Sequence, residues 1–300
     1  MTSPSGRAAA AARGGRWQGA GEFPVGEAEW TLLAADTSHD RHYRQMVLLG
    51  TGTSVGVPTI GCDCAVCRSS NPKNQRTRCG AACGLPHGNL LVDTPTDLRA
   101  QLLREGIGLV HAVLYTHEHA DHVFGLDDLR LFPIYLGGPV PLYGEPGVRA
   151  RILRSFDYAF NPPAHIHVGG VPRLEFHTIS TQPFNVLGAR VIPIRLAHAR
   201  HVDVLGFRIG NVAYCTDTNG IPAASRALLK GLDVLVLDAL RSRPHATHFS
   251  LDEAVAVARE LRPRRTLFTH LSHELEHEAT CARLPTGMEL AYDGLRIPLT

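Results

Sequence analysis

The chain has 300 residues, of which 44% are hydrophobic and 19% charged, as in an ordinary globular protein. No apolar run reaches the roughly 18 residues of a membrane-spanning helix, so no membrane partner is expected. The net charge of +2 conceals an uneven distribution, because residues 1–21 contain three arginines and no acidic residue. The remaining chain holds 27 basic and 28 acidic residues. This balance argues against nucleic acid as a partner.

The first 44 residues differ in composition from the rest of the chain. They begin with an Ala-, Gly- and Arg-rich stretch of low complexity. We interpret residues 1–44 as an N-terminal extension or an organelle transit peptide, and residues 45–300 as the folded domain. The protein is accordingly expected in the cytoplasm, or in a mitochondrion or plastid if the first segment is a transit peptide.

From residue 46 onward, short apolar strands alternate loosely with helical patterns. In chain order the predicted strands are 89–97, 111–117, 189–198, 204–210, 212–218, 232–240 and 265–273. Helices are predicted at 98–107, 147–160, 221–232 and 250–263, and the last begins with a capping box formed by Ser250 and Glu253. The predicted fold class is α/β, with a mixed sheet sandwich covered by helices.

The histidines and cysteines occur in tight groups. The chain contains 17 histidines and seven cysteines, and Cys62, Cys64 and Cys67 are separated by only one or two residues. An odd number of cysteines spaced in this way fits a disulfide framework poorly. It fits metal binding in a reducing compartment well.

The segment "THEHADH" places His117, His119, Asp121 and His122 directly after an apolar strand. Ligands two residues apart on an extended loop project to alternating sides, and the turn that follows lets the last two curl back. The segment can therefore contact one ion with its first pair of side chains and a second ion with the other pair. Two ions about 3.5–4 Å apart can make a hydroxide between them strongly nucleophilic.

The remaining ligands are expected where other strands end. Candidates are His198 or His201, Asp217, and His270 or His273, each after an apolar run. Any one of these histidines alone is more often a surface or core residue. Their shared position at strand ends, where open sheets gather functional groups, makes coincidence a poor explanation for the set.

The order of these motifs resembles the metallo-β-lactamase superfamily of αββα hydrolases. The segments "GTGTSVGVPTIGCDCAVC" and "THLSHELEH" further resemble the branch of cyclic ribose-phosphate phosphodiesterases. The resemblance implies a four-layer αββα sandwich and binuclear phosphodiester hydrolysis by a metal-bridging hydroxide. It implies the following ligands: His117, His119 and His198 for the first ion, Asp121, His122 and His270 for the second, and Asp217 bridging both. The family's third-motif histidine usually precedes Gly, whereas Ala199 follows His198, so His201 stays an alternative.

The same resemblance implies a separate structural zinc, held by Cys62, Cys64, Cys67 and His273. A Cys₃His set closes a tetrahedron and leaves no open position for chemistry. Free thiols in a reduced loop are the alternative. The other cysteines are interpreted as packing residues: Cys79, Cys83, Cys215 and Cys281.

Further residues are assigned roles around the centre. Asp121 and His248 are the catalytic candidates, and His248 has the family's position for a general acid or phosphate contact. Asp93 is expected to accept hydrogen bonds from the metal histidines. Arg76 and Arg78 could contact a substrate phosphate, but a solvated basic turn is the preferred interpretation. The histidines of "AHIH", 165 and 167, are interpreted as surface residues.

The sequence thus predicts a metal-dependent phosphodiesterase for a small cyclic nucleotide- or sugar-phosphate-type substrate. Two active-site ions, Zn or Mn, and one structural Zn are expected, and the family's tendency suggests a homodimer. Three alternatives stay open: an RNA-processing nuclease of the same superfamily, the branch linked to pyrroloquinoline quinone biosynthesis, and a non-catalytic metal-binding module.

Overall fold

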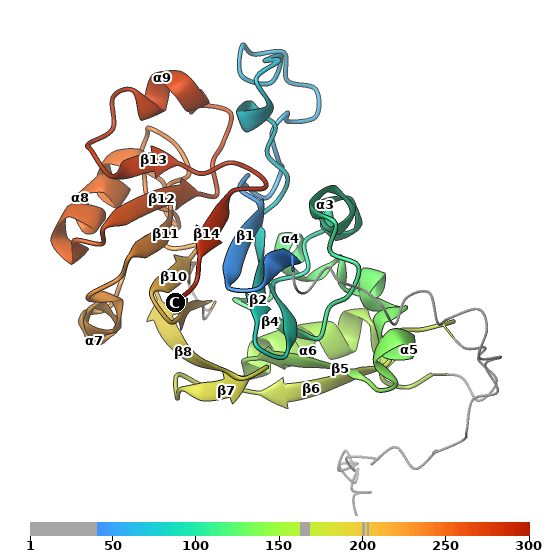
Figure 1. Ribbon diagram of the computed structural model, residues 1–300. Coiled ribbons are helices and arrows are strands. Elements are labelled where there is room, and N and C mark those ends of the chain that lie inside the picture. The colour runs from blue at the N-terminus through green and yellow to red at the C-terminus, as the bar shows by residue number, and fades with distance from the viewer. Residues whose placement is uncertain (1–40, 163–168, 200–201, 203) are drawn as a thin grey trace, which may run out of the picture.

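Two seven-stranded mixed sheets lie face to face in the computed structural model, which describes residues 41–162, 169–199, 202 and 204–300 (Figure 1). The first sheet has the order β14-β1-β2-β3-β4-β5-β6 and the second the order β13-β12-β11-β10-β9-β8-β7. The first sheet consists of β1 (Gln45–Gly50), β2 (Gly80–Leu85), β3 (Gly88–Val92), β4 (Ala112–Leu114), β5 (Val140–Gly144), β6 (Leu174–Thr178) and β14 (Arg296–Pro298). The second consists of β7 (Phe184–Val186), β8 (Ala189–Leu196), β9 (Val204–Ile209), β10 (Val212–Cys215), β11 (Val234–Asp238), β12 (Arg265–Thr269) and β13 (Met288–Leu290).

Helices cover the outer faces of both sheets. Those that follow strands of the first sheet are α3 (Leu98–Glu105), α4 (Ala120–Val123), α5 (Phe132–Leu136) and α6 (Pro146–Ser155). Those that follow strands of the second are α7 (Ala223–Arg226), α8 (Leu251–Leu261) and α9 (His277–Cys281). Short 3₁₀ turns are η1 (Pro72–Asn74), η2 (Leu126–Leu129), η3 (Asp157–Ala159) and η4 (Ala227–Leu229). Figure 1 shows α8 and α9 on the opposite side of the molecule from α3 and α5.

The apolar side chains form three layers of core, which explains why the strands are nearly continuous apolar runs. Along β1, Met46 and Leu48 point between the sheets, whereas Val47 and Leu49 point toward the helices over the first sheet. A third cluster joins the second sheet to α8 and the preceding turns. Strands buried on both faces lose the alternation of polar and apolar residues. The predicted four-layer αββα sandwich is confirmed.

Strand direction gathers the ends of several strands at one edge. Strands β10, β11, β12 and β13 run parallel, so the residues that follow β10 and β12 emerge on the same side of the second sheet. In the first sheet, β3, β4, β5 and β6 are parallel to one another, and β4 leads into the segment Thr116–His122. The carboxyl ends of parallel strands are where α/β folds place their functional groups.

The predicted start of one helix is confirmed, whereas the predicted length of another is wrong. The capping box of α8 forms, since Ser250 accepts from the Glu253 backbone N–H and the Glu253 side chain accepts from the Ser250 backbone N–H. The helix predicted at 221–232 is shorter, because only α7 and η4 form. Lys230 is extended and Gly231 has a left-handed φ of 68°, which ends the helical path. Among the described residues, no helix has both the length and the apolar character needed to cross a bilayer.

Candidate metal centre

Three imidazoles from two loops form the first donor group. His117 and His119 follow β4, and His198 follows β8. The ring nitrogens Nε2 of His117 and Nδ1 of His119 lie 2.8 Å apart. The ring of His198 lies 5.5 Å from that of His117 and 5.3 Å from that of His119, measured between centroids. The three ligand atoms therefore converge on one point.

His198 is held in the orientation that a metal ligand requires. Its Nδ1 donates a hydrogen bond to the Thr247 carbonyl oxygen at 2.7 Å, so Nε2 carries no proton when the ring is neutral. Burial lowers the pKa of His198 to about 4 and lowers the pKa of His117 well below its ordinary value. Both rings are therefore neutral at physiological pH, the form that binds metals.

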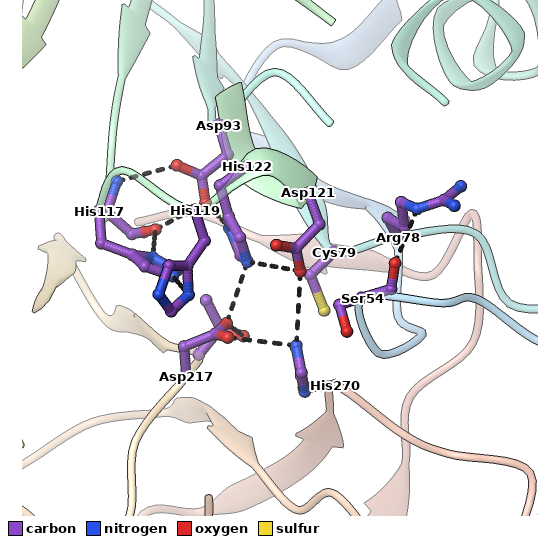
Figure 2. Close-up of polar contacts among 12 residues, drawn as sticks. Ser54, Arg78, Cys79, Asp93, His117, His119, Asp121, His122, Asp217 and His270 are labelled. Carbon is purple, nitrogen blue, oxygen red and sulfur yellow. Dashed lines mark hydrogen bonds and ion pairs between the residues drawn. The ribbon is translucent and has the colours of Figure 1, made fainter. Parts of the chain in front are cut away.

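The second donor group combines two carboxylates with two imidazoles. Asp121 and His122 lie on α4, whereas Asp217 follows β10 and His270 follows β12. Nε2 of His122 lies 3.4 Å from Oδ2 of Asp121 and 3.3 Å from Oδ2 of Asp217. Nε2 of His270 lies 3.2 Å from Oδ1 of Asp217. Figure 2 shows these side chains pointing toward one another.

Asp217 stands between the two donor groups. Each of its oxygens faces a different imidazole of the second group, since Oδ1 faces His270 and Oδ2 faces His122. It also offers a ligand atom within 4.8 Å of those of His198 and His248. Thr216 fixes its rotamer by donating to Oδ2 at 2.7 Å. Asp217 therefore belongs to the second group and also lies beside a ligand candidate of the first.

Buried nitrogen atoms without partners show that the second group fits a cation. Within the described residues, Nε2 of His122 and both ring nitrogens of His270 are buried and have no hydrogen-bond partner. An unsatisfied buried polar atom is costly, and a bound divalent ion would satisfy it. Burial opposes protonation of His122, yet the carboxylates of Asp217, Asp121 and Asp93 raise its pKa well above the ordinary value. The carboxylates thus favour positive charge at this point.

Asp93 accepts a hydrogen bond from one of the candidate metal histidines, as the sequence predicted. It directly follows β3 and is fully buried. Its Oδ2 accepts from Nδ1 of His122 at 2.7 Å, and its Oδ1 accepts from the Thr116 backbone N–H at 2.8 Å. Such an acceptor fixes the tautomer of a histidine and leaves Nε2 for a metal.

Three residues of the centre have left-handed backbone conformations that side chains other than glycine adopt rarely. The φ angles are 66° at Asp93, 54° at Asp217 and 60° at His270. All three lie where a strand ends and the chain must turn sharply. Strain of this kind is retained where the surrounding structure fixes it, and it is concentrated at functional sites.

His248 lies beside the two donor groups and is oriented by Asp238. The centroid of its ring is 4.6 Å from that of His270 and 4.8 Å from that of His198. Its Nδ1 donates to Oδ2 of Asp238 at 2.7 Å, and Asp238 is fully buried at the end of β11. Asp238 was not among the residues predicted from the sequence, although "VLVLD" is an apolar strand that ends in a polar residue, as the neighbouring strands do.

A second cluster lies apart from the first and contains the cysteines. Nδ1 of His273 lies 3.2 Å from Sγ of Cys62, 3.8 Å from Sγ of Cys64 and 3.4 Å from Sγ of Cys67. Three thiols around one imidazole nitrogen match the donors of a closed tetrahedral zinc site. The remaining cysteines are free, and three are buried in the core: Cys79, Cys83 and Cys215.

The interpretation of Arg76 and Arg78 as a solvated basic turn is wrong. Arg76 is only 1% exposed and donates to the carbonyl oxygens of Ser272 and Leu275. The Arg78 guanidinium contacts Asp97 at 3.1 Å and the Ser54 carbonyl oxygen at 2.9 Å. Both are used to hold loops in place. Three other histidines of the sequence analysis lie outside the described residues: those at 165, 167 and 201.

Comparison with protein families assigns most of the chain. Residues 88–271 match the Beta-lactamase superfamily domain. The chain is 36% identical over 253 residues to an octanoyltransferase of Porphyromonas gingivalis (strain ATCC BAA-308 / W83), covering 83% of this chain and 50% of that protein. It thus spans about half the length of that relative. It is 27% identical over 295 residues to a ribonuclease Z of Myxococcus xanthus (strain DK1622), covering 77% of this chain and 95% of that protein.

Solved structures give a consistent result. A crystal structure described as a new diphosphatase from the PhnP family is 43% identical and superposes with a TM-score of 0.77, covering 84% of this chain and 96% of that one. The Zn²⁺-bound PqqB from Methylobacterium extorquens, 23% identical with a TM-score of 0.69, covers 85% of this chain and 100% of that one and shows the shared fold. With its αββα layers and its groups of candidate metal ligands, the chain belongs to the beta-lactamase superfamily and has the metallo-β-lactamase fold of metal-dependent hydrolases.

Proposed function

We propose that the protein hydrolyses a phosphodiester of a small molecule with two divalent ions. The observation that carries this proposal is the pair of adjacent donor groups with Asp217 between them. Two divalent ions bound there would neutralise charge on the phosphate oxygens and make a water molecule nucleophilic near neutral pH. Donor sets that mix imidazole and carboxylate suit Zn or Mn.

The chain's own residues divide into two ligand sets. His117, His119 and His198 would hold the first ion, and Asp121, His122 and His270 the second. Asp217, which lies within ligand distance of His198 as well as of the second group, would be shared between the two ions. Asp93 and the Thr247 carbonyl oxygen orient His122 and His198, so their Nε2 atoms face the centre. These ligand assignments follow the convergence of the ring nitrogens and carboxylates.

His248 would transfer the proton that the reaction needs at the leaving group. Its side chain is 12% exposed and is therefore accessible to solvent beside the centre. Its Nδ1 is bound to Asp238. Because Nδ1 donates to Asp238, Nε2 of the neutral ring carries no proton. It would first accept the proton released by the attacking water and then donate it to the departing oxygen atom. Asp121 would act through the second ion, because its Oδ2 lies in the same donor group as His122 and His270.

A diphosphate is the second candidate substrate. It is favoured by the 43% identity to a structure described as a diphosphatase. Phosphodiesters and diphosphates both present a phosphorus atom with an ester or anhydride oxygen as leaving group, so the same arrangement serves both. A small substrate fits the near-neutral charge of residues 22–300 better than RNA does. The homodimer and the compartment stay predictions.

The cysteine cluster is proposed as a structural metal site. Cys62, Cys64, Cys67 and His273 provide four donors and no open position, so an ion there would stabilise the loop without taking part in the reaction. It would join the loop after β1 to the segment after β12.

The proposal is tested by turnover of bis-p-nitrophenyl phosphate. Metal-free protein is reconstituted with Zn²⁺ or Mn²⁺ and compared with Asp217→Ala, with the exposed His87→Ala as a matched surface control. Metal-dependent turnover that Asp217→Ala loses and His87→Ala keeps supports the proposal. No metal-dependent turnover in the intact chain would contradict it and favour a non-catalytic module.

Two further substrates separate the candidates. Phosphate release from ADP faster than diester cleavage would make the protein a diphosphatase. Cleavage of a structured RNA with a 3′ extension, faster than either small substrate, would favour the RNA-processing nuclease. Each comparison uses the same reconstituted protein, so differences in metal content cannot account for differences in the rates of cleavage.

A further inference from the structure

Two loops that are far apart in sequence meet at the cysteine cluster. The cysteines lie in the loop that follows β1, whereas His273 lies in the segment between β12 and α9, 211 residues from Cys62. The same segment begins with His270 of the active centre. Contacts between these two loops therefore bear on how the four donors are brought together.

Arg76 contacts both loops and is almost completely buried. Its backbone N–H and C=O pair with those of Val57, at 2.7 and 2.8 Å, and close the base of the loop that contains the cysteines. Its Nη1 donates to the Ser272 carbonyl oxygen at 2.9 Å and its Nη2 to the Leu275 carbonyl oxygen at 2.7 Å. These two carbonyl groups lie on either side of His273 in the sequence.

Asn74 completes the connection from the same loop. It is fully buried, and its Oδ1 accepts from Nη2 of Arg76 at 3.2 Å and from the His277 backbone N–H at 2.9 Å. Its Nδ2 donates to Oε1 of Glu276 at 2.8 Å. Arg76 and Asn74 together therefore hold the segment Ser272–His277 at four points.

We propose that Arg76 is a positioning residue that assembles the Cys₃His metal site before the ion arrives. This inference rests on the structural metal site proposed above. The guanidinium fork suits the task, because its donors point in fixed, diverging directions and reach two carbonyl groups three residues apart. A lysine ammonium at the same place is a single point and cannot reach both. A preassembled site binds its ligand more tightly, since less ordering remains to be done on binding.

The burial of Arg76 agrees with this role rather than with one in substrate binding. Burial lowers its pKa to about 10, so it stays charged at neutral pH while its side-chain donors serve backbone and amide oxygens. A buried charge is costly unless it is fully hydrogen-bonded. Such a group is retained where it fixes the relative position of two segments.

The test measures cobalt binding by the full-length, metal-free chain. Thiolate-to-cobalt absorption reports only on the cysteine cluster, because the described ligands of the other centre include no cysteine. Arg76→Lys and Arg76→Met are compared with Arg68→Met, an exposed arginine of the same loop. We expect Co²⁺ affinity to fall at least about tenfold in both Arg76 variants, which corresponds to about 1.4 kcal/mol, and to be unchanged in Arg68→Met.

A milder variant guards against loss of the fold. If Arg76→Met does not fold, Asn74→Ala leaves the guanidinium in place and is expected to weaken Co²⁺ binding less than Arg76→Lys does. Wild-type affinity in Arg76→Lys and Asn74→Ala would overturn the proposal. Absence of the thiolate band in the wild-type chain would instead overturn the cysteine metal site, and phosphodiester turnover would still be decided by the separate assay.

Discussion

Oδ2 of Asp238 lies 2.7 Å from Nδ1 of His248, and this contact leaves the other ring nitrogen, Nε2, for the metal centre. Asp238 also accepts from the Thr218 backbone N–H at 3.0 Å, so the carboxylate is itself held in place. The geometry has the form of a carboxylate–imidazole pair in which one partner acts through the other. Both residues of this pair come from the same half of the molecule. Asp238 is the last residue of β11, and His248 lies in the loop before α8.

We expect His248→Ala to lower kcat for a phosphodiester by about 10²-fold or more, because general acid catalysis has that magnitude. Asp238→Asn should cause a smaller loss, since the ring stays but its orientation is no longer imposed. The double variant should be no worse than His248→Ala, because the two residues act as one unit. Steady-state kinetics on the metal-loaded protein measure this, and losses that multiply would show that the residues act independently.

Asp217→Ala should remove both active-site ions together. The intact chain is expected to bind about three ions, and the variant about one, because Asp217 belongs to the second donor group and also lies within ligand distance of His198 of the first. Metal analysis after dialysis against a weak chelator provides the count. Retention of one active-site ion by the variant would show that Asp217 contacts a single ion. Cys67→Ser is the complementary variant and should lose only the structural ion.

The strained backbone at His270 predicts an unusual order of stabilities. Its φ of 60° is costly for any residue with a Cβ, by about 1–2 kcal/mol, and glycine avoids this cost. Metal-free His270→Gly should therefore be as stable as His270→Ala, or more stable by up to about 1 kcal/mol, although glycine usually destabilises. Urea denaturation of the two variants in a chelator makes the comparison. A clearly less stable glycine variant would mean that the turn relaxes when the imidazole is removed.

Much of the centre could be predicted because its ligands occur at strand ends. His117, Asp217 and His270 each follow an apolar run, and a parallel sheet brings such ends to one edge. The αββα layers were predictable from the order of strands and helices together with the resemblance to a known family. The sequence favoured His198 over the histidine at 201 as a ligand only because an apolar run precedes it. The structure places His198 beside His117 and His119.

The residues that were missed depend on distant contacts. Arg76 sits among polar residues in "NQRTRCG", which indicates an exposed turn, and its burial arises from a segment that begins almost 200 residues later. Asp238 carries no local sign of its task, because the histidine that it orients lies ten residues away beyond an irregular loop. Sequence patterns report local periodicity, whereas these roles arise from tertiary packing.

His42 offers a pH-dependent test away from the metal ligands. Burial and the Arg296 guanidinium, whose Nη1 lies 2.9 Å from Nδ1 of His42, lower the pKa of this imidazole below its ordinary value of 6.5. The unfolded chain therefore binds this proton more readily, and folding stability falls as the pH drops below about 6.5.

We expect His42→Asn, which keeps an acceptor for Arg296, to lose less stability between pH 7 and pH 5 than the wild type. The difference can reach about 1.4 kcal/mol per pH unit for one proton. Chemical denaturation in a chelator at both pH values measures it. Equal losses of stability in both proteins would show that His42 binds its proton equally well in the folded and the unfolded chain.

The two sheets each contribute only part of the metal centre. The segment after β4 comes from one sheet, whereas Asp217 and His270 follow strands of the other (Figure 2). His198 likewise follows a strand of the second sheet. Among the described residues, neither half supplies all the candidate ligands proposed for either ion. Under the proposed ligand assignment, tight uptake of both ions would require the two halves to have docked correctly, so metal loading would report on folding. Each ion would in turn hold the two halves together where they meet.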